Sequence, residues 1–111
     1  MTNPETNTSG ITVVNIFDIE PEKLDPLLAL WHERAAFIRQ QPGFRSLRLL
    51  RAISTDARFA LVSLVEWESV DALRLATDHE HYYEGPFRAV EELDVSGHPG
   101  IYRIAIDVNA P

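Results

Sequence analysis

Apolar and polar residues alternate along four segments of the chain and follow a helical period along two others. Alternation is typical of strands, and apolar steps of three or four residues are typical of amphipathic helices. Strands are predicted at residues 11–18, 44–54, 58–67 and 100–108, the last of them after a loop at residues 94–100. The first helix is predicted from residue 24 and the second from residue 70 to residue 93.

Turn and cap residues separate these segments. Asp25-Pro26 predicts the cap and first turn of the main body of the first helix, and Pro42-Gly43 predicts its end. Ser69 predicts the cap of the second helix. The short polar stretch "TDA" at residues 55–57 predicts a hairpin between the second and third strands, which are therefore expected to pair antiparallel.

The order strand, helix, strand, strand, helix, strand predicts a ferredoxin-like α+β fold. In this arrangement a four-stranded antiparallel sheet carries both helices on one face. Residues 11–108 are expected to form this single domain, and residues 1–10 are expected to be a disordered tail. Because one face of such a sheet has no helices, we expect the chain to pair as a homodimer, sheet against sheet.

Two apolar rows of the predicted sheet each contain a polar side chain. Asn15 shares the face of Val13 and Phe17 on the first strand, and Ser63 shares the face of Trp67 on the third. Two interpretations remain open on these residues alone. The polar groups could be paired in an ordinary core with Trp67 as packing, or they could line a small-molecule cavity between sheet and helices.

Composition excludes several classes of function. The 111 residues have a formal net charge of −7, which repels phosphate backbones, so nucleic acid is not an expected partner. The chain has no cysteine, which rules out disulfides and thiolate chemistry. With no long apolar run and no signal-peptide pattern, a cytoplasmic protein without a membrane partner is expected.

Histidines near residue 80 are candidates for chemistry. His79, His81 and Glu84 have a spacing that approaches a metal-binding motif, but histidines two residues apart on a helix point in nearly opposite directions. No metal site is therefore expected. His81 is a candidate base near neutral pH, and His81 and Tyr82 are candidates for the mouth of the cavity.

Four stretches together resemble the antibiotic biosynthesis monooxygenase family of dimeric α+β barrels: "VVNIFDI", "QQPGFRSLRLLR", "LVSLVEWES" with "VDALRLA", and "IYRIAIDV". The resemblance covers residues 11–108 and implies a homodimer in which two sheets form a barrel. Each subunit would keep its own pocket between sheet and helices. Similar members include anthrone oxygenases, which use O2 without flavin, haem or metal.

The resemblance also implies roles for individual residues. The family's strand-one asparagine falls on Asn15 and its strand-three tryptophan on Trp67, which are the expected catalytic residues. Ser63 stands where some oxygenases have an asparagine, and Leu73 stands where one has an aromatic residue. Arg88 corresponds to a basic residue of the second helix with a shift of one position. Ser63, Leu73 and Arg88 are expected to bind substrate, as are His81 and Tyr82.

The function that the resemblance implies is a cofactor-independent monooxygenase that acts on a small, anthrone-type aromatic substrate with O2. The alternatives are a polyketide cyclase and a non-catalytic small-molecule-binding dimer on the same cavity. A haem-degrading monooxygenase is disfavoured, because Ala76 and Gly85 stand where that branch has a tryptophan and a haem-ligating histidine.

Overall fold

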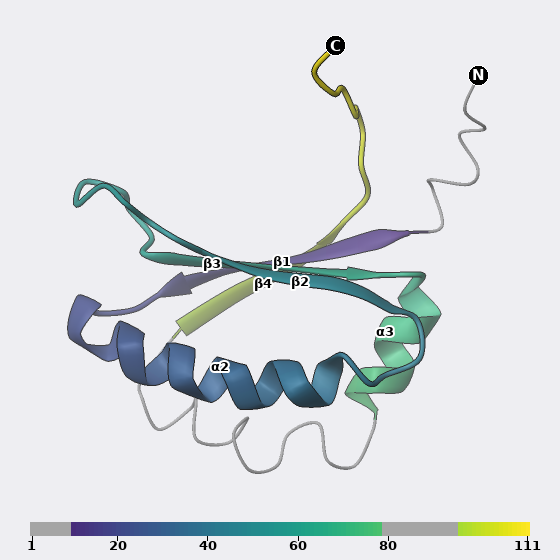
Figure 1. The fold of residues 1–111 in the computed structure, drawn as a ribbon, viewed down its shortest axis with the longest axis horizontal. Helices are drawn as coiled ribbons and strands as arrows, with labels where there is room; N and C mark the ends of the chain where they lie inside the picture. The colour runs from purple at the N-terminus through teal and green to yellow at the C-terminus, as the bar shows by residue number, and fades with distance from the viewer. Residues whose placement is uncertain (1–9, 79–95) are drawn as a thin grey trace.

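The computed structural model describes residues 10–78 and 96–111, which form a four-stranded sheet and two α-helices (Figure 1). The strands are β1 (Ile11–Asp18), β2 (Phe44–Arg51), β3 (Leu61–Trp67) and β4 (Ser96–Tyr102). The helices are α2 (Leu24–Ile38), which follows a 3-10 turn η1 (Pro21–Lys23), and α3 (Val70–Thr77). The predicted continuation of the second helix beyond residue 78 lies outside the described residues.

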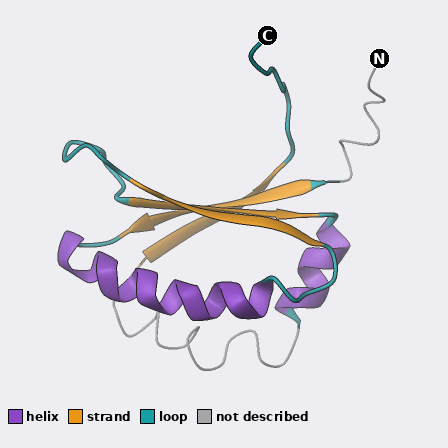
Figure 2. Cartoon of the chain, in the orientation of Figure 1, coloured by secondary structure: helices purple, strands orange, loops and turns teal. Residues whose placement is uncertain are grey.

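The sheet has the strand order β2-β3-β1-β4, and the pairs β2–β3, β3–β1 and β1–β4 are all antiparallel. Both helices lie on the same face of the sheet (Figure 2). The ferredoxin-like α+β class predicted from the sequence is thereby confirmed. The sheet of one chain is open, so the barrel formed by two chains remains a prediction.

The core lies between the sheet and the helices, with apolar side chains from both layers. Its buried residues are Ile11, Phe17, Leu24, Leu27, Trp31, Ile38, Leu61, Val65, Trp67, Ala72 and Ala76. Within the described residues, neither helix is long and apolar enough to cross a membrane.

The helix α2 begins earlier than its predicted cap. The 3-10 turn η1 leads directly into Leu24, so Asp25 lies inside the first turn of α2 and is not its cap. Pro26 is accommodated there because the first backbone N–H groups of a helix have no partner within the helix. The Asp25 carboxylate instead accepts a hydrogen bond from Arg51 on β2 at 3.1 Å. The predicted cap of α3 is confirmed, since the Ser69 hydroxyl accepts a hydrogen bond from the Ala72 N–H at 3.1 Å.

The fourth strand occupies a different segment from the predicted one. Residues 96–100, predicted as a loop, pair with β1, so that His98 lies opposite Ile16 and Pro99 opposite Asn15. Glycine and proline are compatible with this strand because β4 is at the edge of the sheet, where a missing N–H leaves no neighbour unpaired. The prediction of a strand through residue 108 was wrong. Beyond Tyr102 the chain leaves the sheet on the face opposite the helices (Figure 1).

The turn from α2 into β2 depends on Gly43. Its φ angle of 84° lies in the left-handed region that glycine adopts without strain, and its carbonyl accepts a hydrogen bond from the Glu68 N–H at 2.7 Å. A Cβ at this position would lie 2.5 Å from the Cβ of Ala72 on α3. Gly43 therefore allows β2 and α3 to approach each other closely at one end of the molecule.

Gly43→Ala is expected to lower the free energy of unfolding by about 2 kcal/mol, because it combines a strained backbone with overpacking. Urea denaturation followed by circular dichroism measures the change. Gly10→Ala is the control, since its Cβ would meet only the guanidinium end of Arg45, which can move away. That variant should change stability by less than about 0.5 kcal/mol. Equal stability of the two variants would contradict this account of the turn.

Candidate active site

The pairing of β1 with β3 brings the polar residues of the two strands together. Asn15 lies directly opposite Ser63, Val13 lies opposite Val65, and Ile11 lies opposite Trp67. On the other side of β1, Pro99 lies opposite Asn15. The residues predicted to share a face therefore form adjacent cross-strand pairs on one part of the sheet.

These pairs form the sheet wall of a cavity of about 280 Å³. From the strands it is lined by Val13, Asn15, Ser63, Val65, Trp67, Pro99 and Ile101. From the helices it is lined by Trp31, Arg34, Ile38, Leu73 and Thr77. Its volume is just below the usual range of roughly 300–1,000 Å³ for small-molecule sites, which suits a small ligand.

The structure places four of the seven site residues named from the sequence in this cavity: Asn15, Ser63, Trp67 and Leu73. The other three, His81, Tyr82 and Arg88, lie outside the described residues.

Sequence reasoning missed two functional groups of α2. The helical period predicts Trp31 for the apolar stripe of the first helix, and Arg34 is not among the predicted site residues, yet both line the cavity. Their spacing of three residues places them on one helical face, which is the signal that would have found Arg34.

Three polar atoms in the cavity walls are buried and have no hydrogen-bond partner among the described residues. They are the Oδ1 of Asn15 and the Nε1 atoms of Trp31 and Trp67. Leaving a buried polar atom unpaired costs about 1–3 kcal/mol, and most buried polar atoms in proteins are paired. One acceptor and two donors are therefore present in the walls for a ligand with complementary groups.

Trp67 belongs to the core and to the cavity wall. Its side chain is 1% exposed, and its ring packs edge-on against Phe44 with centroids 5.8 Å apart and an angle of 83° between the planes. This T-shaped contact holds the indole firmly. One aromatic side chain thus closes one end of β3 and presents an N–H group to which residues 10–78 and 96–111 offer no partner.

The amide of Asn15 lies against the backbone of β4. A Cβ on Gly97 would be 3.0 Å from Asn15 Oδ1 and 3.3 Å from its Nδ2. The missing side chain of Gly97 leaves room for the amide group of Asn15 in its present position.

Arg34 brings a positive charge to a cavity that is otherwise mostly apolar. Its guanidinium carbon lies 4.7 Å from the centre of the Trp31 ring, which is the geometry of a cation–π contact. A positive charge near a substrate favours the ionised form of an acidic group on it. Among the described residues that line the cavity, none is a histidine or a carboxylate.

No group of three histidine, aspartate or glutamate side chains in residues 10–78 and 96–111 is arranged to hold a metal ion. The histidines considered for this role from the sequence, His79 and His81, lie outside those residues.

Solved structures of other proteins share this fold. SnoaB from Streptomyces nogalater, a cofactor-independent oxygenase solved as a mutant, superposes with a TM-score of 0.77 at 24% identity over 92% of this chain and 99% of its own. A candidate monooxygenase from Shewanella loihica PV-4 gives a TM-score of 0.73 at 25% identity over 89% of this chain and 97% of its own. A conserved protein from Methanosarcina mazei Go1 gives a TM-score of 0.74 at 22% identity over 89% of this chain and 96% of its own.

No curated protein matches the chain significantly. The sequence model of the antibiotic biosynthesis monooxygenases matches residues 10–85, which include β1, β2, β3 and both helices. The chain therefore belongs to the antibiotic biosynthesis monooxygenase family.

Proposed function

We propose that the chain is a cofactor-independent monooxygenase that oxidises a small planar aromatic substrate of the anthrone type with O2. The observation that carries this proposal is the mostly apolar cavity in which one amide oxygen and two indole N–H groups are buried and have no hydrogen-bond partner in the described part of the chain. Membership of the family supports a monooxygenase-type reaction. The similar fold of SnoaB, described as a cofactor-independent oxygenase, is consistent with it.

The reaction can proceed without an added reductant. An anthrone has an acidic methylene carbon, which loses a proton to form an electron-rich carbanion. This carbanion passes an electron to O2, and recombination of the two radicals forms the carbon–oxygen bond. The methylene becomes a carbonyl and the second oxygen atom leaves as water, so the substrate supplies all the electrons that O2 needs. The protein has to bind, polarise and shield the substrate.

Asn15 and Trp67 are assigned the central roles. The amide of Asn15 positions the substrate: its NH2 group donates to the substrate oxygen and polarises it, and its Oδ1 accepts from a substrate hydroxyl. The ring of Trp67 packs against the substrate, and its N–H, which has no partner among the described residues, is available as a donor. Ser63 lies directly opposite Asn15, and its hydroxyl adds a second hydrogen-bonding group on the same part of the sheet. Leu73 from α3 supplies apolar surface.

Arg34 is assigned the stabilisation of the substrate anion. Its positive charge lowers the pKa of a nearby acidic carbon by favouring the carbanion. The other described residues that line the cavity carry no charge. The group that takes the proton is proposed to be His81, a residue outside those described, or water at the cavity mouth.

We also propose that the chain functions as a homodimer through the face of the sheet opposite the helices. Val14, Ile16, Val62 and Leu64 alternate with the cavity residues along β1 and β3 and therefore form an apolar patch on this face. No described helix covers this face of the sheet (Figure 2). The C-terminal segment, which leaves the sheet on this side (Figure 1), exposes Ile106 and Val108, each by 83%. An apolar patch of this kind that no described helix covers is typical of an interface between subunits.

Asn15→Ala is expected to reduce kcat for the oxidation of anthrone about 100-fold, because the amide that polarises the substrate oxygen is lost. Trp67→Phe retains an aromatic ring but loses the N–H and the bulk of the fused second ring, so a reduction of about 10-fold is expected. The quinone absorbance in air measures both rates. Leu75→Ala is the control, since Leu75 on α3 is 68% exposed and does not line the cavity. Wild-type rates in both site variants would refute these assignments.

Labelled oxygen separates the oxygenase from its alternatives. With ¹⁸O2 the quinone is expected to contain one labelled oxygen atom, and without O2 no product should form. A cyclase would form its product under anaerobic conditions, and a non-catalytic binder would bind anthrone without turnover. A haem-degrading enzyme would show a Soret band when titrated with hemin.

Leu64→Glu is expected to convert the dimer into a monomer, because it places a charge in the apolar patch opposite Val14. Light scattering after size exclusion should then give 12.6 kDa for the variant and twice that mass for the wild type. Leu75→Glu introduces the same charge on an exposed position of α3 and should remain dimeric. A wild-type protein of 12.6 kDa would disprove the dimer.

A further inference from the structure

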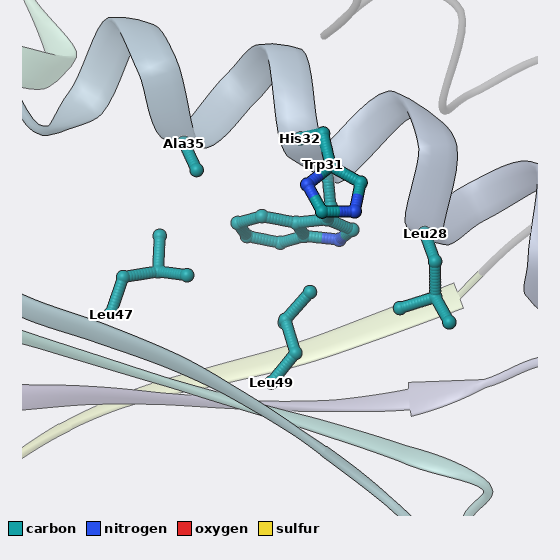
Figure 3. A pocket seen from close by; sticks show the side chains of 6 residues that line it. All are labelled: Leu28, Trp31, His32, Ala35, Leu47 and Leu49. Atoms are coloured by element: carbon teal, nitrogen blue, oxygen red, sulfur yellow. The ribbon is translucent and has the colours of Figure 1, made fainter.

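A second hollow lies next to the substrate cavity, between α2 and β2 (Figure 3). Its volume is about 270 Å³, close to that of the substrate cavity. Leu47 and Leu49 point into it from β2, while Leu28 and Ala35 lie along its helical side (Figure 3). Almost all of its surface is apolar, with His32 as the exception on α2.

Among the described residues, Trp31 alone lines both the substrate cavity and the second hollow. The side chain is 3% exposed, and its ring lies edge-on to Phe17 with centroids 6.1 Å apart and an interplanar angle of 80°. The guanidinium of Arg34 lies over the ring at 4.7 Å. Contacts from β1 and from the next turn of α2 thus hold the indole as a fixed wall between two hollows of similar size.

We propose that Trp31 determines the size of the substrate by closing off the second hollow, which would otherwise accept a further apolar ring or alkyl branch of the same molecule. This inference rests on the proposed substrate cavity. The ligand class follows from the lining, because a hollow bounded by leucine, alanine and indole surface favours hydrocarbon and offers little to a charged group.

The indole suits this role better than its neighbours. Leu28 and Ala35 line only the second hollow, and Ile38 and Leu73 line only the substrate cavity. Truncation of any of these would enlarge one space without joining it to the other. Truncation of Trp31 removes a wall that is shared, and among the described residues it breaks no hydrogen bond to the indole N–H.

The test compares the binding of a three-ring anthrone with that of an anthrone carrying a fourth fused ring, using calorimetry to obtain each dissociation constant. Wild-type protein should bind the three-ring ligand and bind the four-ring ligand at least about tenfold more weakly. Trp31→Leu should bind the four-ring ligand at least about tenfold more tightly than the wild type does. Trp31→Phe, a smaller change that preserves the fold more securely, should give an intermediate gain.

Two further variants show where the fourth ring goes. Leu47→Ala enlarges the second hollow and leaves the wall in place, so the preference for the three-ring ligand should remain that of the wild type. Adding Leu49→Phe to Trp31→Leu fills the hollow again and should abolish the gain.

The inference is overturned if both Trp31 variants fold and retain the wild-type preference, or if Leu47→Ala gives the same gain as Trp31→Leu. Failure of the wild-type protein to bind either ligand would instead overturn the proposed substrate cavity, and this inference with it.

Discussion

The antiparallel pairing of β1 with β3 is the constraint on which the site depends. Side chains alternate along a strand, so a slip of one residue in one of the two strands would turn its cavity residues to the opposite face. Large apolar pairs stand at both ends of the paired segment, Ile11 with Trp67 and Phe17 with Leu61, and all four side chains are buried. Because these ends fix the register, the pair in the middle, Asn15 and Ser63, can be polar without endangering the fold.

The polar atoms of the cavity that have no partner among the described residues lower the stability of the fold but leave hydrogen-bonding groups for a ligand. Burial of a polar atom without a partner costs about 1–3 kcal/mol, and a ligand that paired with Asn15 Oδ1 or with either indole N–H would recover part of that free energy. The aromatic rings that carry two of them also contribute large apolar contacts, through Phe44 for Trp67 and Phe17 for Trp31. Indole is suited to this purpose because its ring stabilises the core while its N–H remains available to a substrate.

Alternation and cap chemistry predicted the fold class, the bounds of β1, the cap at Ser69 and the shared face of Asn15, Ser63 and Trp67, because these features depend on neighbours in the sequence. The position of β4 could not be predicted in the same way. Its pairing with β1 depends on backbone groups, and its Gly97 and Pro99 resemble a loop. Trp31 is a similar case, since helical periodicity shows which face is buried but not that one side chain separates two hollows.

The alternation that forms the cavity also connects it to the proposed dimer interface. Asn15 faces the helices, whereas its neighbours Val14 and Ile16 face the uncovered side of the same strand. A second chain packed on that side would bury Val14 and Ile16 and restrict the backbone of β1 on both sides of Asn15. The interface beneath the amide would then restrict its backbone, while Gly97 beside it leaves the room that its present position needs. In the proposed reaction the protein mainly positions and polarises its substrate, so such rigidity would contribute directly to catalysis.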